Sequence, residues 1–479
     1  MAAVPSTLQK QATRPAVESI GSFAVSVRPE DLTARLRSLY KRNILDSIGC
    51  AISALAGAPF SALRQQFEEY RASGTCSLIG GGKTAPDQAA LFNSGLVRYP
   101  DLLDSYMAPG GLCHPSDNFG AVLAAAEHAG ASGEEFMLAL AIAYEIQCRF
   151  TAAVPVMAKG LNHAMQLAMS AAAAAGRLFG LSADEIANAI AIATADNVSL
   201  ACVHVEPVSQ WKGFSPGMTC MRAVYAASLA KRGFTGPHGL FEGPKGLEQL
   251  LGQRVDVDWE DKSLDFIAQT VLKKYASLIH GQPVLEATLD LRRSYNLDAS
   301  AVEQVRCDIF AAGFDFAGGG TYGSKDHVWN KEQGDYNLKY LISAALLDGE
   351  VGPDQLEPSR IRAADAQAMV ARVEVRPDPQ LTARFPNELA ARITIRTKDQ
   401  RILEKEHLGY EGGLDQPMSW DRAVEKFHWL SERFADQGLR DEIIQAVQQL
   451  DSQPIARLID LLTQVRTVAT YRRTHPGIQ

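Results

Sequence analysis

The sequence lacks the cysteine patterns that hold metal ions or disulfide frameworks. Its seven cysteines lie far apart, between Cys50 and Cys307, and no two of them form a C-x-x-C pair. This argues against a zinc knuckle and against an iron–sulfur cluster held by a local motif. An odd number of widely spaced cysteines instead indicates free, mostly buried thiols in a reducing compartment.

Long hydrophobic runs are also missing. The longest, FMLALAIAY at 136–144, is too short to span a bilayer. Residues 1–21 contain no continuous apolar stretch of the kind that signal peptides carry. We therefore expect a soluble, cytoplasmic protein.

A cationic excess is absent as well. The protein has 47 Lys and Arg residues against 55 Asp and Glu residues, a formal net charge of −8. This balance argues against nucleic acid and anionic membranes as partners. A small anionic substrate stays compatible with it, because a pocket can be locally cationic. With 479 residues, the sequence exceeds one compact core, and we expect two domains.

Familiar nucleotide-binding motifs are incomplete. The segment GGGKT at 80–84 ends like a phosphate loop, but Ser77 stands where that motif needs its first glycine. A glycine-rich turn is the better interpretation. The glycines of 316–324 do not follow a strand into a helix, as a dinucleotide fingerprint does.

Helical patterns fill the sequence from about residue 30 to 265. Ser132 with Glu135, and Ser182 with Glu185, have the spacing of capping boxes at helix starts. The alanine-rich segment 164–181 favours a helix that other helices can approach closely.

The pattern changes near residue 270. Segments rich in β-branched residues predict strands at 302–310, 371–377 and 391–397. Helical spacing lies between them and returns near the C-terminus. We expect a mainly α protein with an α+β insert. Residues 1–268 and 408–479 would form a helical domain, and residues 269–407 a smaller α+β lid domain.

The segment DLLDSYMAPGGLCHPSDN at 101–118 gathers acidic and histidine side chains around a Pro-Gly-Gly sequence. His114 precedes a proline, which favours an extended backbone that can present the ring from a loop. It could equally cap the helix that follows. Asp104 is a candidate acid or base, or a solvated carboxylate in a connection between helices.

Four further residues could carry chemistry, each with a structural alternative. His163 precedes the alanine-rich helix, where an anion could bind, although on its own the residue is more typical of a buried structural histidine. Lys212, in an irregular segment beside a tryptophan, could bind a carboxylate or face solvent. Lys273 is similarly ambiguous, as are its neighbours Lys274 and His280. Tyr322 could donate to an oxyanion or lie on the surface. Together these residue types suit proton transfer on a polyanionic acid.

Six segments, in order along the sequence, resemble motifs of the MmgE/PrpD family. They are RNILDSIGCAISAL, HPSDNFGAVLAAAE, QWKGFSPGMTCMRAVYAASLAKRGFTGP, LKKYASLIHGQPVLEATLDL, NKEQGDYNLKYLISAALLDG and GGLDQPMSWDRAVEKF. The second and third are especially similar to the 2-methylcitrate dehydratase branch. The resemblance implies a helical domain made from both ends of the sequence, an α+β lid, a homodimer, and no metal or organic cofactor.

The resemblance also implies site residues and an activity. Asp104, His163 and Tyr322 would be catalytic. His114, Lys212 and Lys273 would bind substrate carboxylates. The expected reaction is dehydration of a small tricarboxylate such as 2-methylcitrate. Alternatives are decarboxylation of cis-aconitate to itaconate, epimerisation of a small dicarboxylate, and binding of a polycarboxylate without catalysis.

The sequence departs from the family pattern at several positions. Residues 101–105 differ from the usual Asp-aromatic-Asp/Asn-Asp-Thr. Ala164 and Ala276 stand where many members have proline, and Asn337 stands where histidine is frequent. Tyr322 and Tyr340 have the separation expected for the family's lid tyrosine and its later helix tyrosine. The departures affect the identity of the substrate more than the fold.

Overall fold

The computed structural model describes residues 14–109 and 111–466. The first residues of the sequence, on which the expected lack of a signal peptide mostly depends, lie outside these ranges. All seven cysteines are free, and six of them are buried, as their spacing predicts.

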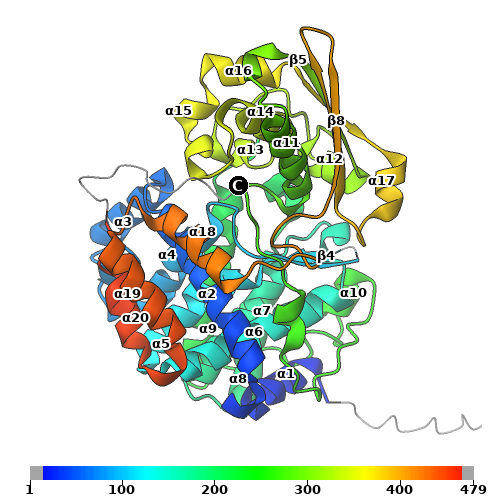
Figure 1. The fold of residues 1–479 in the computed structure, drawn as a ribbon. Helices are drawn as coiled ribbons and strands as arrows, with labels where there is room; N and C mark the ends of the chain where they lie inside the picture. The colour runs from blue at the N-terminus through cyan, green and yellow to red at the C-terminus, as the bar shows by residue number, and fades with distance from the viewer. Residues whose placement is uncertain (1–13, 110, 467–479) are drawn as a thin grey trace, which may run out of the picture.

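Helices from both ends of the sequence form the larger part of the molecule, at the bottom of Figure 1. The N-terminal series is α1 (Ala16–Ser26), α2 (Ala34–Ser53), α3 (Ala58–Glu69), α4 (Pro86–Arg98), α5 (Phe119–Ala129), α6 (Gly133–Ala153), α7 (Ala164–Leu178), α8 (Ala183–Ala195), α9 (Trp211–Ala230) and α10 (Leu247–Leu251). The C-terminal series is α18 (Trp420–Ser431), α19 (Gln437–Gln448) and α20 (Ile455–Leu462). Both series contribute to one hydrophobic core.

Local sequence explains where two of these helices begin. Ser132 Oγ accepts from the Glu135 backbone N–H at 3.2 Å, and Glu135 Oε2 accepts from the Ser132 N–H at 2.8 Å. Ser182 and Glu185 form the same reciprocal pair at 3.3 and 2.8 Å. Both predicted capping boxes are therefore confirmed.

The alanine-rich helix α7 lies in the middle of the helical part. Residues 164–176 of α7 are all buried, and the helix packs against α6, α8 and α9. Alanine has no side-chain atoms beyond Cβ, so neighbouring helices approach closely. The adjacent α6 is long and apolar enough to match a membrane span, but 89% of its most apolar window is buried inside the protein. It packs as a core helix.

The glycine-rich segment near residue 80 is a turn. It joins the short strands β1 (Cys76–Ser77) and β2 (Lys83–Thr84), which pair antiparallel. Gly80, Gly81 and Gly82 have φ values of 85°, 91° and 94°, a conformation that residues with side chains rarely adopt. The glycines thus serve the turn, as the sequence predicted.

A four-stranded sheet with flanking helices forms the α+β part, residues 282–408, at the top of Figure 1. The strand order is β6-β5-β7-β8, with β5 and β6 parallel and the other pairs antiparallel. The strands are β5 (Val302–Ile309), β6 (Val373–Pro377), β7 (Ala390–Thr397) and β8 (Ile402–Leu408). The helices are α11 (Gln282–Ser294), α12 (Ala311–Ala317), α13 (Lys331–Gly334), α14 (Leu338–Asp348), α15 (Pro358–Ile361), α16 (Ala364–Val370) and α17 (Pro379–Arg384).

Three of the four strands coincide with predicted segments, and β8 does not. Four of the seven residues of β8, ILEKEHL, are charged or polar, and most of these four are exposed. The strand is at the edge of the sheet, where only Leu403 is fully buried. Without a buried face, its sequence carries little of the alternation that identifies strands.

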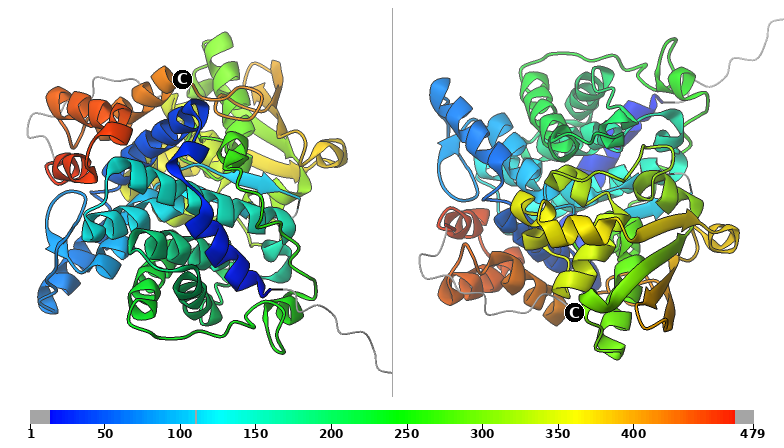
Figure 2. Two further views of the ribbon diagram at one scale, coloured as in Figure 1. Left: turned by 90° about the horizontal axis from the view of Figure 1, so that it is seen from below. Right: turned by 90° about the horizontal axis from the view of Figure 1, so that it is seen from above.

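The polypeptide returns to the helical part after β8. Helix α18 packs against α2, and α20 packs against α5. Both views of Figure 2 place these last helices, orange to red, beside the blue and cyan N-terminal helices. The protein is therefore mainly α with an α+β insert, and the residue limits predicted for the two domains stay a prediction.

Close approach of α4 and α5 generates a stability prediction. A Cβ on Gly120 would lie 2.1 Å from the backbone nitrogen of Ser94 and 2.6 Å from the carbonyl carbon of Asn93. Backbone atoms cannot move aside without shifting a helix, so we expect Gly120→Ala to destabilise the fold by about 1–3 kcal/mol. Chemical denaturation measures this change.

Gly438→Ala is the matched control, because a Cβ there meets only Asp436 Oδ1 at 3.5 Å. Alanine in a helix is favoured over glycine, so this variant should be as stable as the parent or slightly more stable. Equal unfolding free energies for Gly120→Ala and the parent would contradict the close contact.

Candidate active site

A cavity of about 440 Å³ gathers most of the residues singled out in the sequence. It lies beside the antiparallel hairpin of β3 (Tyr106–Ala108) and β4 (Gly111–Cys113). Figure 1 shows strand β4 of this hairpin where the two parts meet. Its polar residues include His114, His163 and Lys273. Convergent polar groups in a cavity of this size are typical of a small-molecule site.

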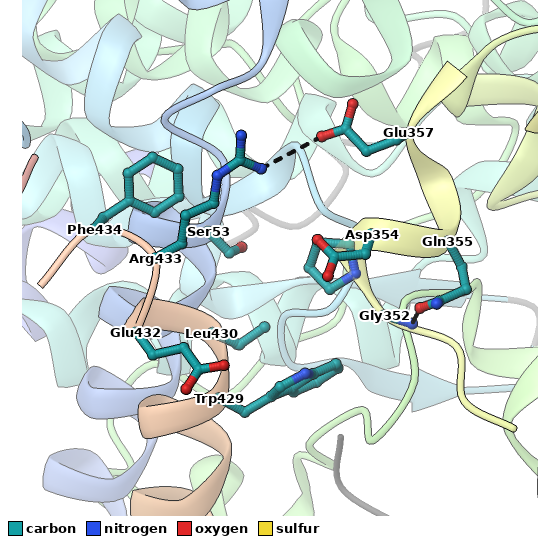
Figure 3. Close-up of a pocket in the computed structure, with 11 residues that line it drawn as sticks. Ser53, Gly352, Asp354, Gln355, Glu357, Trp429, Leu430, Glu432, Arg433 and Phe434 are labelled. Carbon is teal, nitrogen blue, oxygen red and sulfur yellow. Dashed lines mark hydrogen bonds and ion pairs between the residues drawn. The ribbon is translucent and has the colours of Figure 1, made fainter. Parts of the chain in front are cut away.

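Two other hollows are less suited to a ligand. One, of about 850 Å³, includes Ser182, Glu185 and Glu135 in its lining, and these residues already serve as helix caps. A hollow of about 40 Å³ separates α18 from the segment 352–357, with Arg433 and Glu357 facing each other across it at 3.8 Å (Figure 3). It has room for only a few water molecules and forms a seam between the two parts.

Four of the six predicted site residues line the cavity: His114, His163, Lys273 and Tyr322. Lys212 and Asp104 do not line it and are buried behind its wall. The chemical roles assigned to these six residues stay predictions.

Asp101 is at the centre of a buried ion-pair network. Its Oδ1 accepts hydrogen bonds from Arg98 Nη1 at 2.7 Å and from Lys273 Nζ at 2.8 Å, while Lys212 Nζ lies 3.6 Å from Oδ2. These four side chains are 0% or 1% exposed. Burial alone would raise the pKa of Asp101, but Arg98, Lys273 and Lys212 hold it well below its usual value. Asp101 is therefore ionised at neutral pH.

Lys212 joins this network to a second carboxylate. It donates a hydrogen bond to Asp335 Oδ1, and Lys331 Nζ donates to Asp335 Oδ2 at 2.7 Å. The Lys212 ammonium also lies 3.8 Å from the centre of the Tyr336 ring, which lines the cavity. Burial lowers the pKa of Lys212 to about 8, although Asp335 and Asp101 act to raise it.

The local structure around Lys212 corrects the sequence analysis. Tryptophan, glycine and proline neighbours suggested an irregular segment, but Lys212 lies in the first turn of α9. Pro216 is inside this helix. Its nitrogen has no hydrogen to donate to the Lys212 carbonyl, which removes one helical hydrogen bond without ending the helix.

Asp104 is buried and does not line the cavity. Its Oδ1 accepts from Ser116 N at 3.0 Å and from Ser116 Oγ at 2.7 Å, and its Oδ2 accepts from Tyr144 at 2.8 Å and from Asn43 at 3.3 Å. Burial raises its pKa to about 6 against the effect of these hydrogen bonds. Asp104 therefore fixes the loop, and Asp101 is the aspartate that meets the predicted lysines.

His114 is a neutral ring held by the same loop. Its Nδ1 lies 2.6 Å from the Asp104 carbonyl oxygen, which can only accept, so Nδ1 carries the hydrogen and Nε2 is left as an acceptor. Burial, together with Lys273 and Arg98, lowers its pKa well below the usual value. The ring makes no hydrogen bond that caps the following helix. A neutral ring fits a base better than the cationic role predicted for His114.

His163 forms a second neutral imidazole beside the first. Its Nε2 lies 3.4 Å from Asp117 Oδ2, and burial lowers its pKa although Asp117 acts to raise it. The His163 and His114 rings meet edge to face, with centroids 4.9 Å apart. His204, which stacks on Tyr336 with ring centroids 5.3 Å apart, continues this polar wall.

Lys426, from α18, ties the charged segments together. Its Nζ donates to the backbone oxygens of Leu102 at 2.9 Å and of Lys273 at 2.7 Å, and it pairs with Asp46 of α2 at 2.6 Å. The Lys426 side chain is fully buried. It therefore positions the loop that carries Asp101 relative to Lys273.

The remaining candidates have different surroundings. Tyr322 lines the cavity and stacks on Phe316 with ring centroids 4.2 Å apart. Lys274 pairs with Glu286 at 2.9 Å and is not among the lining residues. The Tyr340 hydroxyl donates to the Gln355 carbonyl, which gives this residue a structural contact.

Sequence reasoning assigned no role to several residues of the site. Arg98 precedes Asp101 by three positions, a spacing at which oppositely charged side chains pair on helices. This spacing was the feature of the sequence that could have indicated the ion pair. Asp335 and Tyr336 lie inside one of the segments that carried the family resemblance. His204 is in a short helical turn with no motif around it.

Within residues 14–109 and 111–466, no group of three or more His, Cys, Asp or Glu side chains has the arrangement of a metal site. The expectation that the protein needs no metal or organic cofactor stays a prediction.

Comparison with known proteins gives a consistent result along the sequence. The MmgE/PrpD N-terminal domain matches residues 18–260, and the MmgE/PrpD C-terminal domain matches residues 275–452.

Three curated relatives share between 24% and 27% identity with this protein. The cis-aconitate decarboxylase-like protein oryM of Aspergillus oryzae is 24% identical, over 92% of this protein and 96% of the relative. The 2-methylcitrate dehydratase-like protein oryR of the same fungus is 27% identical, over 64% and 66%. The 2-methylcitrate dehydratase of Escherichia coli is 24% identical, over 77% and 80%. With both family domains matched in order, the protein belongs to the MmgE/PrpD family.

Proposed function

We propose that the protein is a dehydratase, a carbon–oxygen lyase, of a small tricarboxylate such as 2-methylcitrate. The reaction removes a proton from the carbon next to a carboxylate and hydroxide from the neighbouring carbon. A carbon–carbon double bond forms, and the proton and hydroxide leave as water. The observation that carries the proposal is the cavity wall where Lys273, paired to buried Asp101, lies beside two neutral histidines.

The cations of this wall suit a polycarboxylate. Lys273 lines the cavity, and Arg98 and Lys212 lie behind it around the same aspartate. Removal of a proton next to a carboxylate places negative charge on that carboxylate, so fixed cations stabilise the transition state. Because these cations are already held by Asp101 and Asp335, they need little reorganisation when charge develops.

His163 is the proposed base. Burial keeps its ring neutral near pH 7, and Asp117 lies beside Nε2 to orient the ring and stabilise the imidazolium that forms. His114 lies edge to face with it and can accept through Nε2. Tyr322 is the proposed donor to the departing hydroxyl, and Asp104 positions the loop instead of moving a proton. The proposed enzyme acts as a homodimer in the cytoplasm.

Decarboxylation of cis-aconitate is the second candidate. It is supported by the similarity to oryM, which extends over 96% of that relative. The same cations would stabilise the carbanion left when carbon dioxide departs, and protonation of that carbanion would complete the reaction.

Proton NMR in deuterated buffer distinguishes these reactions. With 2-methylcitrate, we expect its signals to be replaced by those of an unsaturated tricarboxylate. Itaconate formed from cis-aconitate would replace the first proposal by the second. If only deuterium exchange at a carbon next to a carboxylate is seen, the protein is an epimerase. Thermal stabilisation by both acids without any reaction would leave a binding protein.

The two aspartates of the loop generate a paired prediction. Asp101→Asn removes the charge that holds Arg98, Lys212 and Lys273, and we expect kcat/KM for the substrate to fall about 10²–10³-fold. Asp104→Asn keeps an acceptor for Ser116, so we expect a much smaller loss. Steady-state kinetics measures both values, with circular dichroism as the check of folding. A larger loss in Asp104→Asn would instead make Asp104 the acid or base.

The lowered pKa of Lys212 generates a pH prediction. Below about pH 8 its ammonium is charged and contributes to the attraction of the substrate; above that pH the charge is lost. We expect kcat/KM to decrease on the alkaline side with an apparent pKa of about 8. Lys212→Arg, whose guanidinium stays protonated, should lose this decrease even if its overall rate is lower. An unchanged alkaline profile in this variant would assign the titration to another group.

A further inference from the structure

His204 is a cavity residue whose two ring nitrogens have different surroundings. It lines the cavity, and its side chain is buried. Its ring centroid lies 6.4 Å from that of His163, the proposed base, and its plane is within 4° of the Tyr336 ring. Nε2 is hydrogen-bonded, whereas Nδ1 has no partner within residues 14–109 and 111–466. What His204 can do for a bound molecule therefore depends on which nitrogen carries the hydrogen.

The amide of Asn162, which contacts His204, has a fixed orientation. Its Oδ1 accepts a hydrogen bond from the Ala164 backbone N–H at 2.9 Å, so its NH₂ group is the part that faces His204. The Nδ2 of this group donates to His204 Nε2 at 2.8 Å. The backbone is held as well, because the Asn162 N–H donates to the Ser199 carbonyl at 2.8 Å. An inverted amide would place two donors against each other at Ala164, so the orientation is settled by the contacts.

The Asn162 amide decides the tautomer of His204. An NH₂ group only donates, so Nε2 accepts and the hydrogen of a neutral ring is on Nδ1. The ring is neutral at pH 7, because burial lowers its pKa well below the usual value, with smaller contributions from His163, Lys212 and Arg98. A buried donor without an acceptor is rare in folded proteins, and a bound ligand is one way to satisfy it. The Nδ1–H of His204 is such a donor.

His114, the other side of the histidine cluster, has the opposite arrangement. Its Nδ1–H is taken by the Asp104 carbonyl, and its Nε2 is left as an acceptor. The cavity thus contains one imidazole with an acceptor for a ligand and one with a donor. A polycarboxylate presents many acceptors, so His204 is the imidazole suited to a carboxylate oxygen.

We propose that His204 is a further catalytic residue, whose Nδ1–H donates to the substrate carboxylate next to the carbon that loses the proton. The inference rests on the proposed dehydratase function and adds a residue to its site. A donor beside His163 meets this carboxylate, because the carbon that gives its proton to His163 is bonded to it. As the proton leaves, negative charge develops on the carboxylate, and a donor fixed in advance stabilises it without reorganisation. Asn162 is a positioning residue, which keeps the hydrogen on Nδ1.

Nitrogen-15 NMR of histidine-labelled protein tests the tautomer. The signals of His204, assigned by their loss in His204→Asn, should show a protonated Nδ1 and an unprotonated Nε2. Asn162→Asp puts a carboxylate, which only accepts, against Nε2, so we expect Nε2 to become protonated in this variant. A protonated Nε2 in the parent, or an unprotonated Nε2 in a folded Asn162→Asp, would overturn the inference.

The same labelled protein tests the contact with a carboxylate. Tricarballylate, a tricarboxylate with no hydroxyl to lose, would be added at a concentration that raises the Tm. We expect it to shift the Nδ1–H proton signal of His204 downfield. His238, which is not among the cavity residues, is the internal reference and should not change. An unchanged His204 signal in the stabilised protein would overturn the inference.

Two substitutions of His204 form a matched pair for kinetics. Leucine and asparagine are similar in size and both lose the contact with Asn162, but only asparagine has an NH₂ group near the position of Nδ1. We expect His204→Leu to lower kcat for 2-methylcitrate about 10²-fold, with a smaller change in KM, and His204→Asn to regain about tenfold of this loss. Thermal unfolding checks that both variants fold.

The kinetic outcomes separate the inference from the function on which it rests. Equal kcat values for folded His204→Leu and His204→Asn, with clear turnover by the parent, would overturn the inference and leave the dehydratase proposal intact. A parent protein that neither binds tricarballylate nor dehydrates 2-methylcitrate would overturn both.

Discussion

The buried charge of Asp101 is the constraint on which the site depends. An ionised carboxylate out of contact with water is strongly unfavourable unless cations and hydrogen-bond donors surround it. Here these partners come from the end of α4, the start of α9 and the segment before α11, which are far apart in the sequence. The helical core must bring all three together for Asp101 to be tolerated. A φ of 52° at Asp101, unusual for a residue with a side chain, is part of the same arrangement.

The same cations add to the effect of burial on the protonation of the histidines. Lys273 and Arg98 add to burial in lowering the pKa of His114, and Arg98 does so for His163. The wall proposed to bind carboxylates therefore also helps burial to keep its imidazoles neutral, and a neutral imidazole is what proton abstraction requires. Binding and base strength are coupled through one set of charges. A change that removes a cation would weaken substrate binding and raise the pKa of the proposed base together.

Much of this fold could be predicted from the sequence, and the details of the site could not. Capping boxes, alanine-rich helices and buried strands are local features, and they were found where their patterns indicated. The choice between Asp101 and Asp104 depends on which side of a loop each carboxylate faces, and a backbone turn with positive φ decides it. The spacing of apolar and polar residues in the sequence does not indicate such a turn. Lys212 was misplaced because the proline of α9 resembles a helix breaker, and β8 was missed because an edge strand needs little apolar sequence.

Two groups of residues around the cavity differ in how freely they can change. His163, Arg98 and Lys212 lie on or next to helices of the core, where Lys426 and Asp46 also fix the neighbouring loop. Substitution there disturbs a network of buried charges in which each member needs the others. Phe316 and Phe385 are held by ring contacts, so a change in size alters the space available without leaving a charge unpaired. Chemistry fixed by the helical core and a cavity lining shaped partly by the α+β part would let members of one family act on different acids by a common mechanism.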